Sequence, residues 1–579
     1  MKISIIIPTF NRVQILQRTL PTIFAQDLSD DQFEVIVVND GSTDSTLDYL
    51  RNIRTKTNFR FLDQPHGSQV KAKSHGAREA TGDVLLFLDD DLFCTPGLLS
   101  AHITAHTKTN HTIVQGLVLV SDESPSTLLT DLVRRGHNAF HERVLHQAQP
   151  NFPVDAIVYA NCSIRRSDYE SVGGFNETWQ YAWEDRDLGM RLWRKGMRTV
   201  FAPNALTYEL YIRSEESFCK LEGSRYGACE VRLAHEYPEY RPFAEVTRFL
   251  SGPRWKTALR RRAAEQAELF DSILSLISQI CGAARWISLL SELGIRALAY
   301  RHALWWFNAA CKETNGWKQL IAEFGIRFPV LMYHYVGPPI TGLDSSLQVS
   351  ADDFHAQMEW LEHHNYQPIR VEDWLKWHHG ESKLPAKPVL ITFDDAYSSL
   401  CDHALTELQK RNWPATIFVA TAHVGGKNTW DAQPGITPLQ LMSRKQIADW
   451  STHNIDFGGH SRTHTDLTQL SSSQIEEEVG KCSQDLTNIT GKPPVSFAYP
   501  YGMVNATVVH VVQKHFDIAF LASGGVNDLS SDLYCLRRAM VHPSDNAKAM
   551  FCLTRYGWNV PFTHIFTHLK RLLFAEHPK

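Results

Sequence analysis

Three consecutive aspartates, Asp89 to Asp91, follow the apolar run VLLFL and could hold a divalent cation. Neighbouring carboxylates repel one another, so a folded chain normally neutralises them with a cation. Alternate residues of an extended segment point the same way, so Asp89 and Asp91 can share one ion. Mg²⁺ or Mn²⁺ suits carboxylates combined with diphosphate oxygens. A solvated acidic turn is the alternative for this motif taken alone.

A second candidate site combines two aspartates and two histidines in the C-terminal half. Asp394 and Asp395 end the run ITFDD, and His460 and His464 lie four residues apart in GHSRTH. We expect the two histidines to share one face of a helical turn. Two imidazoles and one carboxylate leave coordination positions open for water, which is typical of a catalytic metal. The second carboxylate can act as a base on that water.

The apolar runs that precede these polar residues indicate strands of two α/β domains. Residues 1–215 alternate runs such as ISIIIP and FEVIVVND with amphipathic stretches, and residues 326–579 return to this alternation. Ligands bind at the carboxyl ends of such parallel strands. Residues 216–325 have few strand signals and long helical patterns. We predict two α/β domains, the second built as a barrel, joined by a helical region.

The composition excludes several classes of protein. Lys and Arg total 58 against 63 Asp and Glu, a net charge of −5, which gives no support for a general nucleic-acid binder. The ten cysteines form no C-x-x-C pair, so we expect buried thiols in a reducing compartment. No run reaches the ~18 apolar residues of a membrane span. We expect a cytoplasmic protein and keep open a peripheral contact with the inner face of the membrane. An amphipathic helix at residues 562–574 could make that contact, although packing on its own domain is the favoured explanation.

The N-terminal region resembles glycosyltransferase family 2, the nucleotide-sugar transferases of the GT-A fold. The matching segments stand in the family's order: IIIPTFNR at 5–12, VVNDGSTD at 37–44, ATGDVLLFLDDD at 80–91 and WEDRDLGMRLWRKG at 183–196. The resemblance implies a Rossmann-like sheet that binds a nucleotide sugar.

This resemblance also implies roles for single residues. The donor would be bound by Pro8, Thr9, Asp40, Lys73, Asp89 and Asp90, with Asp40 at the base. Asp91 would bind Mg²⁺ or Mn²⁺ together with Asp89. Asp185 would be the general base that deprotonates the acceptor hydroxyl, as an inverting displacement requires. The ordinary explanation of WEDRD is an acidic helix start.

Some positions depart from the family's pattern. Asn39 stands where a second acid is usual, Lys73-Ser74 replaces a frequent Arg-Asn, and Tyr208 and Glu209 stand where many relatives have a histidine. The Q-x-x-R-W motif of processive synthases is not visible. We therefore expect transfer of one sugar or a few.

The C-terminal region, residues 328–545, resembles carbohydrate esterase family 4, the polysaccharide deacetylases, through TFDD, HSRTH and FAYPYG. By this resemblance Asp395, His460 and His464 bind Zn²⁺ or another divalent ion, and Asp394 is the general base. The groove would be lined by Tyr499, Pro500, Tyr501 and Arg537. The backbone N–H of Tyr501 would lie in the oxyanion site, and Arg537 or Arg538 would pair with Asp394.

The general acid of this second site is less clearly marked. The opening VLMYHYV resembles a subgroup acting on poly-N-acetylglucosamine, in which an early histidine takes that role. His334 is our candidate and His542 the second choice. The alternative for His334 is a strand histidine bonded to the backbone.

The two resemblances together predict a bifunctional enzyme. One domain transfers a sugar, with UDP-N-acetylglucosamine as the expected donor, to a glycan or lipid-linked acceptor. The other removes N-acetyl groups from an amino sugar. Two alternatives stay open: one domain is an inactive carbohydrate-binding module, or the two domains act on unrelated sugars.

Overall fold

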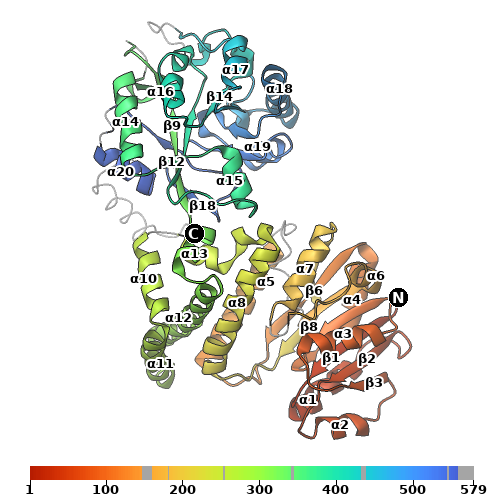
Figure 1. Cartoon of the computed structure of the whole chain (residues 1–579). Coiled ribbons are helices and arrows are strands. Elements are labelled where there is room, and N and C mark those ends of the chain that lie inside the picture. The colour runs from red at the N-terminus through yellow and green to blue at the C-terminus, as the bar shows by residue number, and fades with distance from the viewer. Residues whose placement is uncertain are drawn as a thin grey trace. The chain divides into compact units, whose positions relative to one another are not determined.

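The computed structural model describes residues 1–146, 160–179, 182–251, 254–340, 344–431, 438–543, 545 and 547–557 (Figure 1). The helix predicted at residues 562–574 lies outside the described residues. The chain divides into two compact units, the first made of Met1–Tyr240 and Pro253–Trp317, the second of Arg241–Gly252 and Lys318–Lys579.

The first unit is built around one sheet of eight strands in the order β3-β2-β1-β4-β7-β6-β8-β5. The strands are β1 (Ile3–Thr9), β2 (Phe33–Asn39), β3 (Asn58–Asp63), β4 (Val84–Leu88), β5 (Leu92–Cys94), β6 (Thr112–Val120), β7 (Asn161–Arg165) and β8 (Arg198–Glu209). The first four run parallel, whereas β7 is antiparallel to both β4 and β6. Runs of Ile and Val suit strands that are covered on both faces, and β1 and β2 are buried throughout.

Helices cover both faces of this sheet. They are α1 (Val13–Phe24), α2 (Thr46–Asn52), α3 (Gln69–Glu79), α4 (Leu98–Lys108), α5 (Leu128–His146), α6 (Arg166–Ser171) and α7 (Glu184–Arg194). Successive side chains of β1 enter opposite cores: Ile5 packs with α1, α2 and α4, and Ile6 packs with α3, α6 and α7. The two cores fix the strand ends from which Asp40 and the three aspartates follow.

The first unit also contains most of the predicted helical region. Its helices are α8 (Gly223–Glu236), α10 (Arg254–Glu265), α11 (Ala267–Ala283) and α12 (Ser288–Glu313). A Cβ added at Gly227 of α8 would lie 2.0 Å from the carbonyl oxygen of Trp306 in α12, so the two backbones touch where these helices cross. The second unit takes α9 (Glu245–Leu250) and all but the first residue of α13 (Trp317–Phe324).

The second unit contains a curled sheet of nine strands along the path β17-β16-β15-β14-β13-β9-β18, with β12 beside β13 and β19 beside β9. The strands are β9 (Arg327–Tyr333), β12 (Gln367–Pro368), β13 (Pro388–Phe393), β14 (Ala415–Val419), β15 (Ile455–Gly459), β16 (Ser496–Ala498), β17 (Ile518–Phe520), β18 (Val526–Asp528) and β19 (Ala539–Met540), and β10 (Tyr335–Val336) pairs separately with β11 (Gln348–Val349). The amide of Leu521 donates to Leu536 over 2.8 Å, so the segment before β19 links the end of β17 back toward β9. The predicted α/β class and C-terminal deformed barrel are confirmed.

Helices surround the curled sheet. They are α14 (Ala351–His363), α15 (Val371–His378), α16 (Ala404–Lys410), α17 (Arg444–Trp450), α18 (Ser472–Thr490), α19 (Ala506–Val512) and α20 (Ala547–Tyr556). Local signals set their ends: α18 begins with a capping box between Ser471 and Gln474 and ends at Gly491, whose φ is 78°.

Two further findings concern membrane-spanning helices and disulfides. Among the residues that the structure describes, none of the helices combines the length and the apolar character needed to cross a bilayer. All ten cysteines lie in described segments and none forms a disulfide.

Candidate active sites

Asp40 lies at the carboxyl edge of the first sheet, directly after β2. Its Oδ1 accepts hydrogen bonds from Gln64 Nε2 over 2.7 Å and from the amide of Gly67 over 3.1 Å. The Nδ1 of His66 lies 3.0 Å from its Oδ2, and the His66 ring stacks on Phe10. These contacts come from the turn after β3, so two strand ends together hold this buried carboxylate in place.

Two of the three aspartates after β4 have partners at or just after the end of β1, whereas Asp89 Oδ1 accepts a hydrogen bond from Gln69 Nε2 of α3 over 3.1 Å. Thr9 Oγ1 donates to Asp90 Oδ2 over 2.7 Å. Arg12 Nη1 lies 2.8 Å from Asp91 Oδ2 and 3.4 Å from Asp90 Oδ1. Burial raises the pKa of Asp90 to about 7, although Arg12 opposes this rise, and burial also raises the pKa of Asp89. Lys73 and Arg213 oppose the rise at Asp89, so three cationic side chains surround the three carboxyls.

Glu209 is a further carboxylate at this turn to which our sequence reasoning gave no role. It ends β8 and pairs with Leu92 of β5, next to Asp91 in the chain. The amide of Leu210 donates to the Asp91 carbonyl over 2.8 Å. Burial, followed by the charge of Asp91, raises the pKa of Glu209 to about 8. The sequence offered one signal for a role of Glu209: it stands, with Tyr208, where many members of the resembled family have a histidine.

Glu184 connects Asp185 with Lys73, because it precedes Asp185 in the chain and accepts a hydrogen bond from Lys73. Asp185 lies in the first turn of α7, and its Oδ1 accepts a hydrogen bond from the amide of Arg186 over 2.7 Å. Burial, followed by the charge of Glu184, raises the pKa of Asp185 to about 6. Lys73 Nζ, from α3, donates to Glu184 Oε1 over 3.1 Å and is buried. Lys73 therefore fixes Glu184, the residue that precedes the predicted base Asp185. Sequence reasoning did not anticipate this contact.

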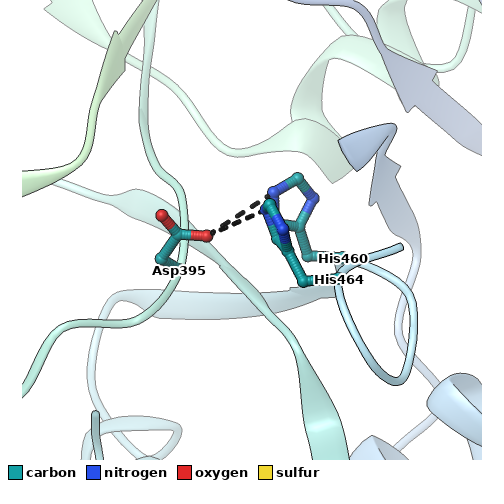
Figure 2. A group of neighbouring side chains, drawn as sticks. All are labelled: Asp395, His460 and His464. Atoms are coloured by element: carbon teal, nitrogen blue, oxygen red, sulfur yellow. Dashed lines mark ion pairs between the residues drawn. The ribbon is translucent and has the colours of Figure 1, made fainter. Parts of the chain in front are cut away.

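The second unit brings together three side chains that could hold a metal ion. Asp395 follows β13, and His460 and His464 follow β15; one ligand atom of each lies within 4.8 Å of the others (Figure 2). Asp395 Oδ1 is 3.3 Å from His464 Nε2 and 3.8 Å from His460 Nε2. His460 Nδ1 lies 2.7 Å from the carbonyl oxygen of Ala498, which leaves Nε2 to face the aspartate. All three side chains are buried.

The loop from His460 to His464 is not the helical turn that we predicted. Ser461 and His464 have φ angles of 58° and 59°, in the left-handed region. The amide of His464 donates to Ser461 Oγ over 2.9 Å, which stabilises this compact loop. The rings still converge, with centroids 4.8 Å apart. The prediction of a helical turn was wrong because a loop can bring residues four apart together without helical backbone angles.

This group fits a divalent cation. Two imidazole nitrogens and one carboxylate oxygen are ligands that Zn²⁺ accepts, with positions left for water and substrate. The buried Nδ1 of His464 has no hydrogen-bond partner in the described structure, and its ring is held instead by Trp430, stacked at 4.4 Å. In the described part of the chain, no other group of three or more Asp, Glu, His or Cys side chains has this spacing.

Asp394 lies beside this group and is paired with Arg538. The guanidinium makes two hydrogen bonds to the carboxylate, of 2.5 and 2.8 Å, and both side chains are buried. Burial would raise the pKa of Asp394, but Arg538 outweighs it and holds that pKa well below its ordinary value. Of the two arginines that the sequence left open, Arg538 makes the pair, whereas the backbone of Arg537 bonds to Asn527.

His334 lies close to Asp394, with its Nε2 3.9 Å from Asp394 Oδ2. Burial lowers the pKa of His334 to about 4, although the charge of Asp394 opposes this. His542 differs, because its backbone amide donates to Asp545 and its carbonyl oxygen accepts from Gln357. His334 is therefore beside Asp394, and its lowered pKa keeps the ring neutral near pH 7 until it receives a proton.

The loop after β16 has one exposed tyrosine and one buried. Tyr501 has a φ of 58°, is 56% exposed, and its ring lies 4.8 Å from His464. Tyr499 and Pro500 are buried, and the Tyr499 hydroxyl donates to the carbonyl of Tyr534 over 3.0 Å. The groove prediction for Tyr499 is therefore corrected to a supporting position beneath the loop, because its side chain packs in the core.

Comparison with known families agrees with this division. Residues 4–173 match the model for glycosyl transferase family 2, and residues 381–516 match the model for polysaccharide deacetylase. Residues 141–215 also match a model described as the N-terminal domain of galactosyltransferase. The chain joins a family 2 glycosyltransferase domain to a polysaccharide deacetylase domain.

Relatives of known name resemble each domain separately. The deacetylase domain is similar to the poly-beta-1,6-N-acetyl-D-glucosamine N-deacetylase of Staphylococcus aureus strain MSSA476, with 28% identity over 29% of this chain and 58% of the relative. YxkH of Bacillus subtilis strain 168, a polysaccharide deacetylase by name, is 25% identical over 41% of this chain and 78% of the relative. The solved mannosyltransferase PcManGT of Pyrobaculum calidifontis is 19% identical over 53% of this chain and 86% of its own, with a TM-score of 0.38. The chain thus spans a little over half of the Staphylococcus enzyme.

Proposed function

We propose that the transferase domain moves an N-acetylhexosamine from a UDP-sugar to a hydroxyl of a glycan or lipid-linked acceptor, and that the deacetylase domain removes the N-acetyl group of an amino sugar. The observation that carries this proposal is that each unit buries a carboxylate that could act as a base. The charges of Asp185 and Asp89 both act on the buried Lys73, and Asp394 lies beside His460.

In the transferase domain, Asp185 would take the proton of the acceptor hydroxyl. The acceptor oxygen then bonds to the anomeric carbon from the face opposite the diphosphate. The bond between that carbon and the diphosphate breaks, and the configuration at the carbon inverts. Asp40 would contact the nucleotide base, and Asp89 with Asp91 would hold the ion. Mg²⁺ or Mn²⁺ would neutralise charge on the leaving diphosphate. Burial raises the pKa of Asp90 and of Glu209, so their ionised forms would be favoured by a cation placed beside them.

In the deacetylase domain, Asp394 would take a proton from water, because Arg538 keeps it ionised. The water oxygen adds to the acetyl carbon, and the carbon–nitrogen bond then breaks to give acetate and a free amine. His334 would deliver a proton to the departing nitrogen, and the Tyr501 amide would donate to the oxyanion. Zn²⁺ or another divalent ion held by Asp395, His460 and His464 would polarise the acetyl carbonyl.

The test measures both reactions in one protein. Purified full-length protein is incubated with a panel of nucleotide sugars, and separately with N-acetylglucosamine oligomers, while nucleotide and acetate release are followed. We expect D185N to lose only nucleotide release and D394N to lose only acetate release. If the wild type releases only one of the two products under every condition, one domain is a binding module and the bifunctional proposal fails.

A second test separates a metal ligand from an acid in the deacetylase domain. H460A should lose bound metal and acetate release together, because it removes one of three protein ligands. H334A should keep the metal and lose turnover, because a proton donor does not bind the ion. Loss of metal from H334A would contradict its role, and full activity with metal bound would transfer the acid role to His542.

A further inference from the structure

The transferase unit has an exposed apolar surface that neither active site uses. It lies on the hairpin formed by α11 and the first half of α12, which we call the hairpin surface (Figure 1). Nine large apolar side chains between residues 269 and 300 are exposed: Leu269, Ile273, Leu276, Ile280, Trp286, Ile287, Leu289, Leu293 and Tyr300. Such a gathering on one element marks an interaction site in a soluble domain.

The exposed residues follow the helical period. Leu269, Ile273, Leu276 and Ile280 stand at intervals of four, three and four, so they form one stripe along α11. The stripe ends at the turn between the helices, where Trp286 is 79% exposed. A stripe with an indole at its tip is a common arrangement for a helix that lies in a membrane interface.

The hairpin is fixed to the transferase unit by its opposite side. Arg301 of α12 is buried and pairs with Asp271 of α11 over 3.0 Å and with Glu215 over 3.2 Å. A Cβ added at Gly294 would lie 2.8 Å from Cys281 Cβ, so the two helices are in close contact. The inner face is therefore occupied, and the apolar stripe is a second, outward face of the same hairpin.

The charges around the hairpin indicate what would cover it. Residues 272–284 contain no charged side chain, and the turn adds only Arg285. The adjoining α10, RWKTALRRRAAE, carries five basic residues and one acidic residue and packs against both α11 and α12. The acidic residues at the edges are paired, Glu268 with Lys220 and Glu292 with Arg135 and Arg296. An apolar stripe beside a basic helix complements a bilayer with anionic headgroups.

We propose that the hairpin surface docks the transferase unit on an anionic membrane, with the α11 stripe and Trp286 entering the headgroup region and the exposed Arg261 and Arg262 of α10 contacting lipid phosphates. The helices would lie along the interface, in keeping with the lack of a described helix able to span it. This inference goes beyond the proposed reactions and does not depend on either of them. It places membrane contact on α11 and α12 instead of residues 562–574.

The test is flotation of the full-length protein with vesicles of phosphatidylcholine, alone or mixed with phosphatidylglycerol. We expect binding to the mixed vesicles that weakens as salt is raised, because headgroup attraction is screened. The double variant W286E/L289E should bind at least about tenfold more weakly. Both side chains are more than three-quarters exposed, so its melting temperature should stay that of the wild type.

Further variants show which surface of the protein is responsible for vesicle binding. F551E makes the same kind of change at an exposed residue of α20 and should float like the wild type. L569E/L572E alters the predicted C-terminal helix and should also float normally, whereas R262E should weaken binding to the mixed vesicles. The proposal is overturned if the wild type does not float, if W286E/L289E floats normally, or if only L569E/L572E loses binding. It is also overturned if the wild type is a dimer that W286E/L289E dissociates, since a second copy would then cover the surface.

Discussion

The transferase and deacetylase sites balance their charges in opposite ways. In the transferase domain, burial raises the pKa of Asp90 to about 7, of Asp185 to about 6 and of Glu209 to about 8, and Arg12 is shared between two aspartates. In the deacetylase domain, Arg538 alone satisfies both oxygens of Asp394.

The difference in charge balance suggests how far each site is formed before it binds an ion or substrate. The three candidate ligands of the deacetylase domain already converge, so an ion would find its binding groups in place before substrate arrives. The carboxylates of the transferase domain repel one another and would be relieved by an ion and its diphosphate together. We therefore expect the first site to be rigid and the second to be completed by its substrate.

The largest expected effect comes from removing each base. D185N and D394N keep side-chain shape but cannot accept a proton, so each should lower its own reaction by ~10²–10⁴-fold. Nucleotide and acetate release are measured on both variants. A loss of less than about tenfold in either variant would assign that base role to another residue.

Breaking the Arg538 pair should test whether the deacetylase site is prebuilt. R538M leaves the buried Asp394 carboxylate without its partner, which should cost about 3–5 kcal/mol of unfolding free energy. Thermal or urea unfolding measures this loss, and acetate release should fall with it. The adjacent R537M is the control and should change stability little. Equal effects of the two variants would contradict the special place of Arg538.

The two reactions should differ in their response to acid. Because the pKa of Asp185 is raised to about 6, this base becomes protonated as the pH falls below 6, and nucleotide release should drop about tenfold per pH unit there. Above pH 6 it is ionised and the rate should level off. Asp394 is held ionised by Arg538, so it should add no such fall to acetate release in this range. Measuring the rates of nucleotide release and of acetate release against pH on the full-length protein tests this difference.

The smallest effect concerns the tyrosines of the groove loop. Y499F removes the hydrogen bond to Tyr534 from a buried position and should lower stability by about 1 kcal/mol. Y501F should leave stability unchanged because Tyr501 is exposed. Unfolding curves compare the two. A larger loss in Y501F would contradict the supporting position of Tyr499.

Most of the fold and of the chemistry could be predicted from local patterns. Continuous Ile and Val runs predicted buried strands, and the polar residues after them marked the edges where Asp40, Asp91 and Asp395 lie. These features depend on neighbours in the chain, since strand period and turn chemistry are local properties. The helical turn at His460 was predicted wrongly for the same reason, because left-handed φ angles at Ser461 leave no signal in spacing alone.

Other contacts between distant segments could not be predicted. Nothing in CLRR distinguishes Arg537 from Arg538, and only the path from β17 back to β9 turns Arg538 toward Asp394. Likewise, Lys73 and Glu184 are 111 residues apart, and Glu209 reaches the aspartate turn only because β8 lies beside β5.

The sequence by itself determined the residue types, their order and the strands that deliver them, because hydrophobic pattern and turn residues act over a few positions. Only the tertiary structure decided which charges pair, which tyrosine of the groove loop is buried, and which apolar face of the α11–α12 hairpin is left outward. Those outcomes follow from burial, which raises or lowers the cost of a charge according to the partner that the fold supplies.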